Sequence, residues 1–143
     1  MGKIKSKKVL ITPLKRIKVA NGDVLHALKK TDLGFSDFGE AYFSCIEENQ
    51  IKAWKRHKLM TLNLIVPFGR VKFVFTEDGK YFDSYTVGED NYCRITVAPQ
   101  IWFGFQNQFR STSIILNIAD IIHDENEVEK KNISIFNYFI SKN

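Results

Sequence analysis

The stretch Gln50–Phe75, QIKAWKRHKLMTLNLIVPFGRVKFVF, decides the fold of this chain. Its first strand-like segment, Lys52–His57, carries several cations and one imidazole, and an apolar run, Leu62–Val66, follows it. After a Pro-Phe-Gly turn, strict alternation in Arg70–Phe75 predicts a strand whose Val and Phe side chains share one face. A basic patch at the entry to an apolar β core is where a small β-barrel places a binding site.

Outside this stretch, strand-like segments recur at roughly 8–12 residue spacing with turn signals between them, which predicts an antiparallel all-β sandwich or barrel. The further expected strands are Val9–Thr12, Val24–Leu28, Glu40–Ile46, Phe82–Val87, Arg94–Val97, Ile101–Gln106 and Ile114–Ile118. Only Asp124–Lys131, with acids first and lysines last, favours a short C-terminal helix. The length of 143 residues predicts one domain, residues 8–143, after a frayed arm of residues 1–7.

Composition and charge exclude several classes of protein. The net charge of +5 favours anionic partners, but acids interrupt the basic Lys52–Lys58 segment, so we expect no nucleic-acid partner. No apolar run approaches the roughly 20 residues of a membrane span, and no signal-length apolar segment follows the basic N-terminus. Cys45 and Cys93 lack C-x-x-C spacing and are expected to be free, buried thiols. We therefore expect a soluble, cytoplasmic protein without a membrane partner.

The candidate chemistry centres on His57. A metal-binding cupin usually carries an H-x-H pair in such a strand, but this chain has Lys55-Arg56-His57, and a protonated lysine is no metal ligand. We therefore expect no metal and no cofactor.

Alternation along the strand predicts which of these side chains share a face. It places Ala53, Lys55 and His57 on one face and Trp54, Arg56 and Lys58 on the other. If the first set points inward, burial and a neighbouring cation lower the pKa of the lysine, and the amine or the imidazole can remove a proton beside a carbonyl. In the other interpretation both side chains reach solvent or a phosphate and move no proton.

Aromatic and amide side chains are further candidates for ligand contacts. Trp54, Trp102, Phe103 and Phe105 form either a stacking wall or ordinary core packing. Asn117, at the end of an apolar run, either contacts a ligand or is a core residue satisfied by backbone groups.

Five segments of this chain, and the order in which they occur, resemble the dTDP-4-dehydrorhamnose 3,5-epimerase family and its 3,4-ketoisomerase relatives. They are FGEAYFS (Phe38–Ser44), IKAWKRHK (Ile51–Lys58), TLNLIVPFGRVKFVF (Thr61–Phe75), GEDNYCRITVAPQIWFGF (Gly88–Phe105) and LNIADIIHDENEVE (Leu116–Glu129). The resemblance implies an antiparallel jelly-roll (cupin) barrel, usually dimeric, that acts on nucleotide-linked 4-keto sugars without metal.

The residues that the resemblance carries over are largely changed. At the four positions of the epimerases' base histidine, lysine, acid tyrosine and second histidine stand Lys55, Leu62, Leu116 and Phe103. The ketoisomerases' second H-x-H histidine corresponds to His57.

The resemblance implies an epimerase- or ketoisomerase-like protein for a dTDP-4-keto-6-deoxyhexose in surface-polysaccharide biosynthesis. His57 is then the expected base or acid and Lys55 the residue that stabilises the enolate. The expected substrate-binding residues are Lys52, which matches a diphosphate-binding arginine of the family, with Trp54, Arg56, Lys58 and Asn117. The alternative is a non-catalytic sugar-nucleotide-binding cupin or a partner subunit, and in either case we expect a homodimer.

Overall fold

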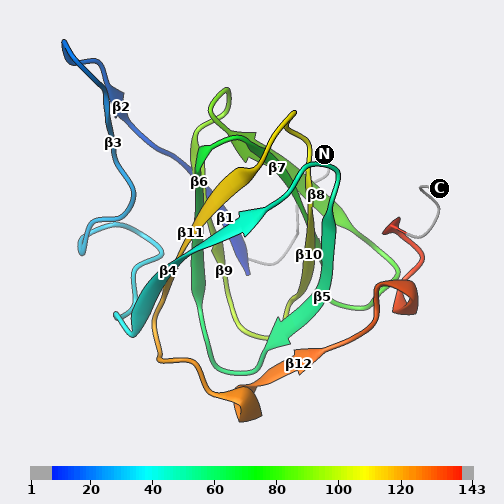
Figure 1. Cartoon of the computed structure of the whole chain (residues 1–143). Coiled ribbons are helices and arrows are strands. Elements are labelled where there is room, and N and C mark those ends of the chain that lie inside the picture. The colour runs from blue at the N-terminus through cyan, green and yellow to red at the C-terminus, as the bar shows by residue number, and fades with distance from the viewer. Residues whose placement is uncertain (1–7, 140–143) are drawn as a thin grey trace.

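The computed structural model describes residues 8–139, which form two antiparallel five-stranded sheets facing each other and a separate two-stranded hairpin (Figure 1). The first sheet has the order β1-β9-β6-β11-β4 and the second β12-β5-β10-β7-β8, while β2 pairs with β3. The strands are β1 (Val9–Pro13), β2 (Arg16–Ile17), β3 (Val24–Leu25), β4 (Glu40–Ile46), β5 (Ile51–His57), β6 (Leu62–Phe68), β7 (Arg70–Thr76), β8 (Asp83–Gly88), β9 (Cys93–Val97), β10 (Trp102–Asn107), β11 (Ser113–Ala119) and β12 (Val128–Lys130). The predicted antiparallel all-β architecture is confirmed.

The main core fills the space between the two large sheets. Val71, Phe73 and Phe75 are each 0% exposed and point inward from β7, as the alternation predicts. They meet apolar side chains from β6, β9 and β11 of the opposite sheet. Gly69 makes the turn between β6 and β7 at a φ of 105°, and a Cβ there would collide with Ser113.

A second, smaller core covers the outer face of the β12-β5-β10-β7-β8 sheet. There the C-terminal segment, residues 132–139, crosses the sheet, and Phe136 and Phe139 pack on Trp54 and Trp102. This apolar layer covers the outer face of the sheet. The inward face of the same sheet is therefore the one that lines the interior.

The predicted helix over Asp124–Lys131 is wrong. Glu125–Glu127 forms a single 3₁₀ turn capped by Asp124, and the chain then continues as strand β12 along β5. An isolated helix of this length is marginal in water, whereas the free edge of β5 offers a full set of backbone hydrogen-bond partners. Pairing of β12 with β5 is therefore favoured over a helix, and it brings Glu127 beside His57.

Three other expectations have mixed outcomes. Cys93 is buried and free as expected, but Cys45 is free and exposed because it points away from the core on edge strand β4. The expected strand Val24–Leu28 is limited to two residues. The predicted arm, residues 1–7, lies outside the described residues. Across residues 8–139, no helix has the length and apolar character to cross a membrane.

Candidate functional site

A cavity of about 440 Å³ opens between the two large sheets, on the side where their edge strands β4 and β12 lie. Ser44 borders it from β4 and Lys130 from β12, while Phe103 and Phe105 of β10 form an aromatic wall. The remaining bordering residues are Lys52, Ala53, Trp54, Lys55 and Lys131. The cavity is thus an aromatic pocket with lysines around it.

A bulge in β5 decides which side chains face this cavity. Phe103 pairs with Lys55, but Gly104 pairs with Ala53, so Trp54 is an extra residue on the β5 side. Phe105 then pairs with Lys52, and directly paired residues of an antiparallel ladder share a face. The inner face of β5 therefore carries Lys52, Lys55 and His57. The simple alternation was right for Lys55 and His57 but wrong for Ala53, which lies with Gly104 on the outer face.

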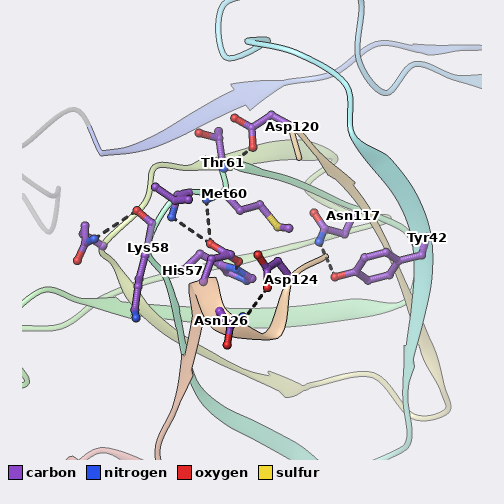
Figure 2. Close-up of polar contacts among 12 residues, drawn as sticks. Tyr42, His57, Lys58, Met60, Thr61, Asn117, Asp120, Asp124 and Asn126 are labelled. Carbon is purple, nitrogen blue, oxygen red and sulfur yellow. Dashed lines mark hydrogen bonds and ion pairs between the residues drawn. The ribbon is translucent and has the colours of Figure 1, made fainter. Parts of the chain in front are cut away.

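His57 forms a buried pair with Glu127. Its Nδ1 lies 2.5 Å from Oε1 of Glu127, and the two side chains are 7% and 3% exposed. The other carboxylate oxygen accepts hydrogen bonds from the backbone N–H groups of Leu59 (3.0 Å) and Met60 (3.1 Å), part of the network drawn around Met60 in Figure 2. Since three donors converge on it, the carboxylate is fixed and ionised, and it orients the imidazole.

The protonation of this pair suits a base. Burial is the largest influence on His57 and lowers its pKa, although the bond to Glu127 opposes that effect. Burial acts to raise the pKa of Glu127, but the hydrogen bonds from His57, Leu59 and Met60 outweigh it, so the pKa lies below its ordinary value. At neutral pH the imidazole is therefore neutral with its proton on Nδ1, and Nε2 has no hydrogen-bond partner within residues 8–139.

Lys55 lies two residues from His57 on the same face, about 7 Å along the strand. It is directly opposite Lys130 of β12, and like charges in such a cross-strand pair repel. Burial, followed by the charges of Lys130 and Lys52, lowers the pKa of the Lys55 amine. In residues 8–139 no hydrogen bond or ion pair engages that amine.

Asn117 points into the interior from β11. It is 5% exposed, and its amide nitrogen donates to the Tyr42 hydroxyl at 2.9 Å, a pair visible in Figure 2. Its Oδ1 is buried and has no hydrogen-bond partner in the described part of the chain. A buried acceptor without a donor costs about 1–3 kcal/mol, so this oxygen is available to a ligand that brings one.

Three of the predicted binding residues point elsewhere. Trp54 is 2% exposed, and its indole packs against Phe82, Phe136 and Phe139 in the outer aromatic layer instead of presenting a face to a ligand. Arg56 lies on the outer face, paired with Glu129 at 2.5 Å and stacked over Trp102 at 4.7 Å. Lys58 follows the strand and is exposed. Alternation along β5 turns Trp54 and Arg56 outward, where the C-terminal cover and Glu129 engage them, and Lys58 faces solvent.

The four candidate aromatics divide in the same way. Phe103 and Phe105 border the cavity, and Phe103 stacks on His57 with ring centroids 6.2 Å apart. Trp102 faces outward beneath Arg56. Among residues 8–139, no three His, Cys, Asp or Glu side chains gather into a group able to hold a metal ion.

Sequence reasoning missed Glu127, Tyr42 and Lys130. Glu127 lies in an acidic run for which the sequence predicts a helix. The available signal was its position directly before Val128, the first residue of a possible strand. For Tyr42 the signal was the polar face Glu40, Tyr42, Ser44 within an otherwise apolar strand. Lys130 had no local signal, because only its pairing with Lys55 turns it toward the cavity.

Comparison with solved structures relates this all-β sandwich, with its basic, aromatic cavity and buried His–Glu pair, to dTDP-sugar isomerases and epimerases. A dTDP sugar isomerase from Desulfovibrio desulfuricans G20 is 32% identical with a TM-score of 0.86, over 90% of this chain and 87% of the other. The chain therefore belongs to the family of this dTDP-sugar isomerase.

Two more distant structures share the fold. The sugar 3,4-ketoisomerase QdtA from Thermoanaerobacterium thermosaccharolyticum, solved in complex with TDP, is 17% identical with a TM-score of 0.75, over 87% of this chain and 89% of the other. The dTDP-4-dehydrorhamnose 3,5-epimerase from Sulfolobus tokodaii is 14% identical with a TM-score of 0.80, over 95% of this chain and 84% of the other. No family model and no curated protein matches the sequence.

Proposed function

We propose that this protein is a nucleotide-sugar epimerase or ketoisomerase acting on a dTDP-4-keto-6-deoxyhexose in surface-polysaccharide biosynthesis. The observation that carries the proposal is the buried His57–Glu127 pair beside an aromatic cavity. Both reactions begin with removal of a proton from a carbon next to the C4 ketone, and a neutral imidazole oriented by a carboxylate is suited to that step.

In this mechanism His57 takes the proton on Nε2 while Glu127 stabilises the imidazolium that forms. Removal of the proton places negative charge on the C4 oxygen, which needs a hydrogen-bond donor. Lys55, two residues away on the same face, is the first candidate for that donor. Tyr42 is the second, since its oxygen accepts from Asn117 and its own proton is left to donate.

The cations at the cavity rim suit the diphosphate of the substrate. Lys52 and Lys130 lie on the inner faces of β5 and β12, and Lys52 donates to the Cys45 carbonyl at 3.0 Å. A diphosphate that bridges Lys52 and Lys130 would be held by charge-assisted hydrogen bonds from both amines. We keep Lys52 as a phosphate-binding residue, add Lys130, and assign Asn117 Oδ1 as the acceptor for a sugar hydroxyl.

The test is exchange of solvent deuterium into dTDP-4-keto-6-deoxyglucose, followed by NMR. We expect deuterium beside the ketone with the wild-type protein, and its loss in His57→Ala with the protein still folded. The non-catalytic alternative, a sugar-nucleotide-binding cupin or partner subunit, predicts a thermal shift with dTDP but no exchange. The side chains that replace three family residues, Leu62, Leu116 and Phe103, favour this alternative and make the exchange experiment necessary.

We also propose a homodimer of jelly-roll (cupin) barrels in the cytoplasm. The β2–β3 hairpin stands away from the two sheets (Figure 1) and exposes Ile17, Val19 and Val24, between 42% and 50% of each side chain. Apolar groups on a projecting hairpin favour burial against a second copy. Light scattering should give twice the 16.6 kDa chain mass, and Ile17→Lys combined with Val24→Lys should reduce it to the monomer.

A further inference from the structure

The Lys55 amine is set apart from the other cations of the site by what surrounds it. It borders the cavity of about 440 Å³ and is half-buried, and within residues 8–139 nothing accepts its hydrogen bonds. Lys52 is its neighbour on the same face of β5, and Lys130 lies directly opposite on β12. The remaining charged groups near it are the His57–Glu127 pair, whose carboxylate is already held by three donors.

This setting favours an uncharged amine. Desolvation is the largest cause that lowers the pKa of Lys55, and the two neighbouring lysines add to it. A sugar seated in the cavity would exclude more water from the amine and maintain the desolvation while its phosphates bind Lys52 and Lys130. A desolvated lysine next to other cations is one of the arrangements that make an amine nucleophilic toward carbonyl carbon.

We infer that Lys55, in place of donating a hydrogen bond to the C4 oxygen, is a covalent catalyst that forms an imine with the ketone of the substrate. The inference rests on the proposed function, because that function supplies the ketone. In this step the Nζ lone pair bonds to the carbonyl carbon and the C=O bond breaks. The two amine protons leave with the oxygen as water, so that one amine and one ketone give one imine and one water.

The imine then determines which reaction follows. After the nitrogen takes a proton from solvent, His57 removes the neighbouring C–H proton, and the electron pair moves through a C=C bond onto nitrogen. Return of a proton to the opposite face and hydrolysis give an epimer at C3 or C5. Because the nitrogen stays bonded to C4 until hydrolysis, this route cannot move the ketone to C3. The imine therefore assigns epimerisation, and not ketone transfer, to this chain.

The first experiment does not depend on the substrate. Pyridoxal 5′-phosphate, an aldehyde that carries a phosphate, is added to the whole protein, the imine is reduced with borohydride, and labelled peptides are identified by mass. We expect Lys55 to be labelled several-fold faster than exposed Lys58, since desolvation and the neighbouring cations lower the pKa of Lys55 and a neutral amine is the nucleophile. Equal labelling of the two lysines overturns the inference.

The second experiment uses dTDP-4-keto-6-deoxyglucose with borohydride. We expect a secondary amine on Lys55, no adduct with dTDP-glucose, which lacks the ketone, and no adduct in Lys55→Arg. Lys55→Arg keeps a cation that can bind an oxyanion but cannot form the imine, so it should lose deuterium exchange.

Full exchange in Lys55→Arg, or a product whose ketone has moved to C3, overturns the imine while the proposed function stands. Absence of exchange in the wild-type protein rejects the proposed function instead, and the pyridoxal labelling still decides whether Lys55 is a reactive amine.

Discussion

The two faces of strand β5 differ in how their polar side chains are satisfied. On the outer face, Arg56 is paired with Glu129 and stacked on Trp102, and Trp54 is enclosed by aromatic rings. On the inner face, Lys55 has no partner within residues 8–139, and His57 uses one ring nitrogen and leaves the other open. One strand thus carries a paired charge within an aromatic layer on one side, where the buried Trp54 N–H lacks a partner among residues 8–139, and unpaired ionisable groups on the other. Unpaired ionisable groups beside a cavity, rather than the presence of charge, mark the candidate site.

The largest expected effect comes from replacing, one at a time, the glutamate on each face of β5. Glu127→Gln removes the inner carboxylate that orients His57, and we expect deuterium exchange to fall about 10²-fold or more. Glu129→Gln, the matched change on the outer face, should leave exchange within about twofold, because Glu129 contacts Arg56 and not the imidazole. Equal losses in both variants would remove the distinction between the faces.

Trp54→Ala tests the outer layer by stability. The side chain is 2% exposed among aromatic rings, so we expect a loss of about 3–5 kcal/mol in the free energy of unfolding, measured with urea. The dissociation constant for dTDP should stay the same for the folded protein. A variant that keeps its stability but loses dTDP binding would show that the indole contacts the ligand after all.

A pair of neighbouring lysines sharpens the comparison at the rim. Lys130 lies on the inner face opposite Lys55, whereas the Lys131 amine lies over Trp102 on the outer face. We expect Lys130→Met to weaken dTDP binding about tenfold, measured by calorimetry, through loss of one charge-assisted contact. Lys131→Met should change it little. The opposite order would place the diphosphate against Lys131, on another part of the cavity rim.

The smallest expected effect is a dependence of stability on pH. The pKa of folded His57 lies below its ordinary 6.5, so the unfolded chain takes up this proton first. The stability from neutral His57 is complete above pH 6.5 and is lost as the pH falls through the folded pKa. Glu127, with a pKa below its ordinary 4.5, extends the loss to lower pH.

Melting temperatures between pH 7.5 and pH 5 would measure this dependence. We expect the acid-side decrease to be shallower in His57→Asn than in the wild-type protein. A decrease in His57→Asn as steep as in the wild-type protein would assign the loss to other groups.

The fold was largely predictable because its information is local. Alternation in Arg70–Phe75 and the turn at Gly69 gave the strands, their inward faces and their antiparallel character. The β12 segment was not predictable in this way. Its acidic run has a weak helical preference of its own, and the strand exists only because the edge of β5 lies beside it.

The site was predictable only where a residue's neighbours lie on its own strand. Lys55 and His57 share a face by simple alternation, so their meeting was expected. Glu127 and Tyr42 come from distant parts of the chain and reach the interior through pairing that no local pattern records. The outward placement of Ala53 and the inward placement of Lys52 could not be predicted, since a bulge has no composition signal that separates it from continuous strand.

The extra residue at Trp54 has a consequence for how this strand can change. Because Ala53 already pairs with Gly104 and Lys52 with Phe105, deletion of the Trp54 codon would make this ladder regular and leave Lys52, Lys55 and His57 on the inner face. The loss would fall on the outer aromatic layer, where Trp54 packs. Among related proteins, a gap at this position of an alignment would then mark a changed outer layer and not a changed site.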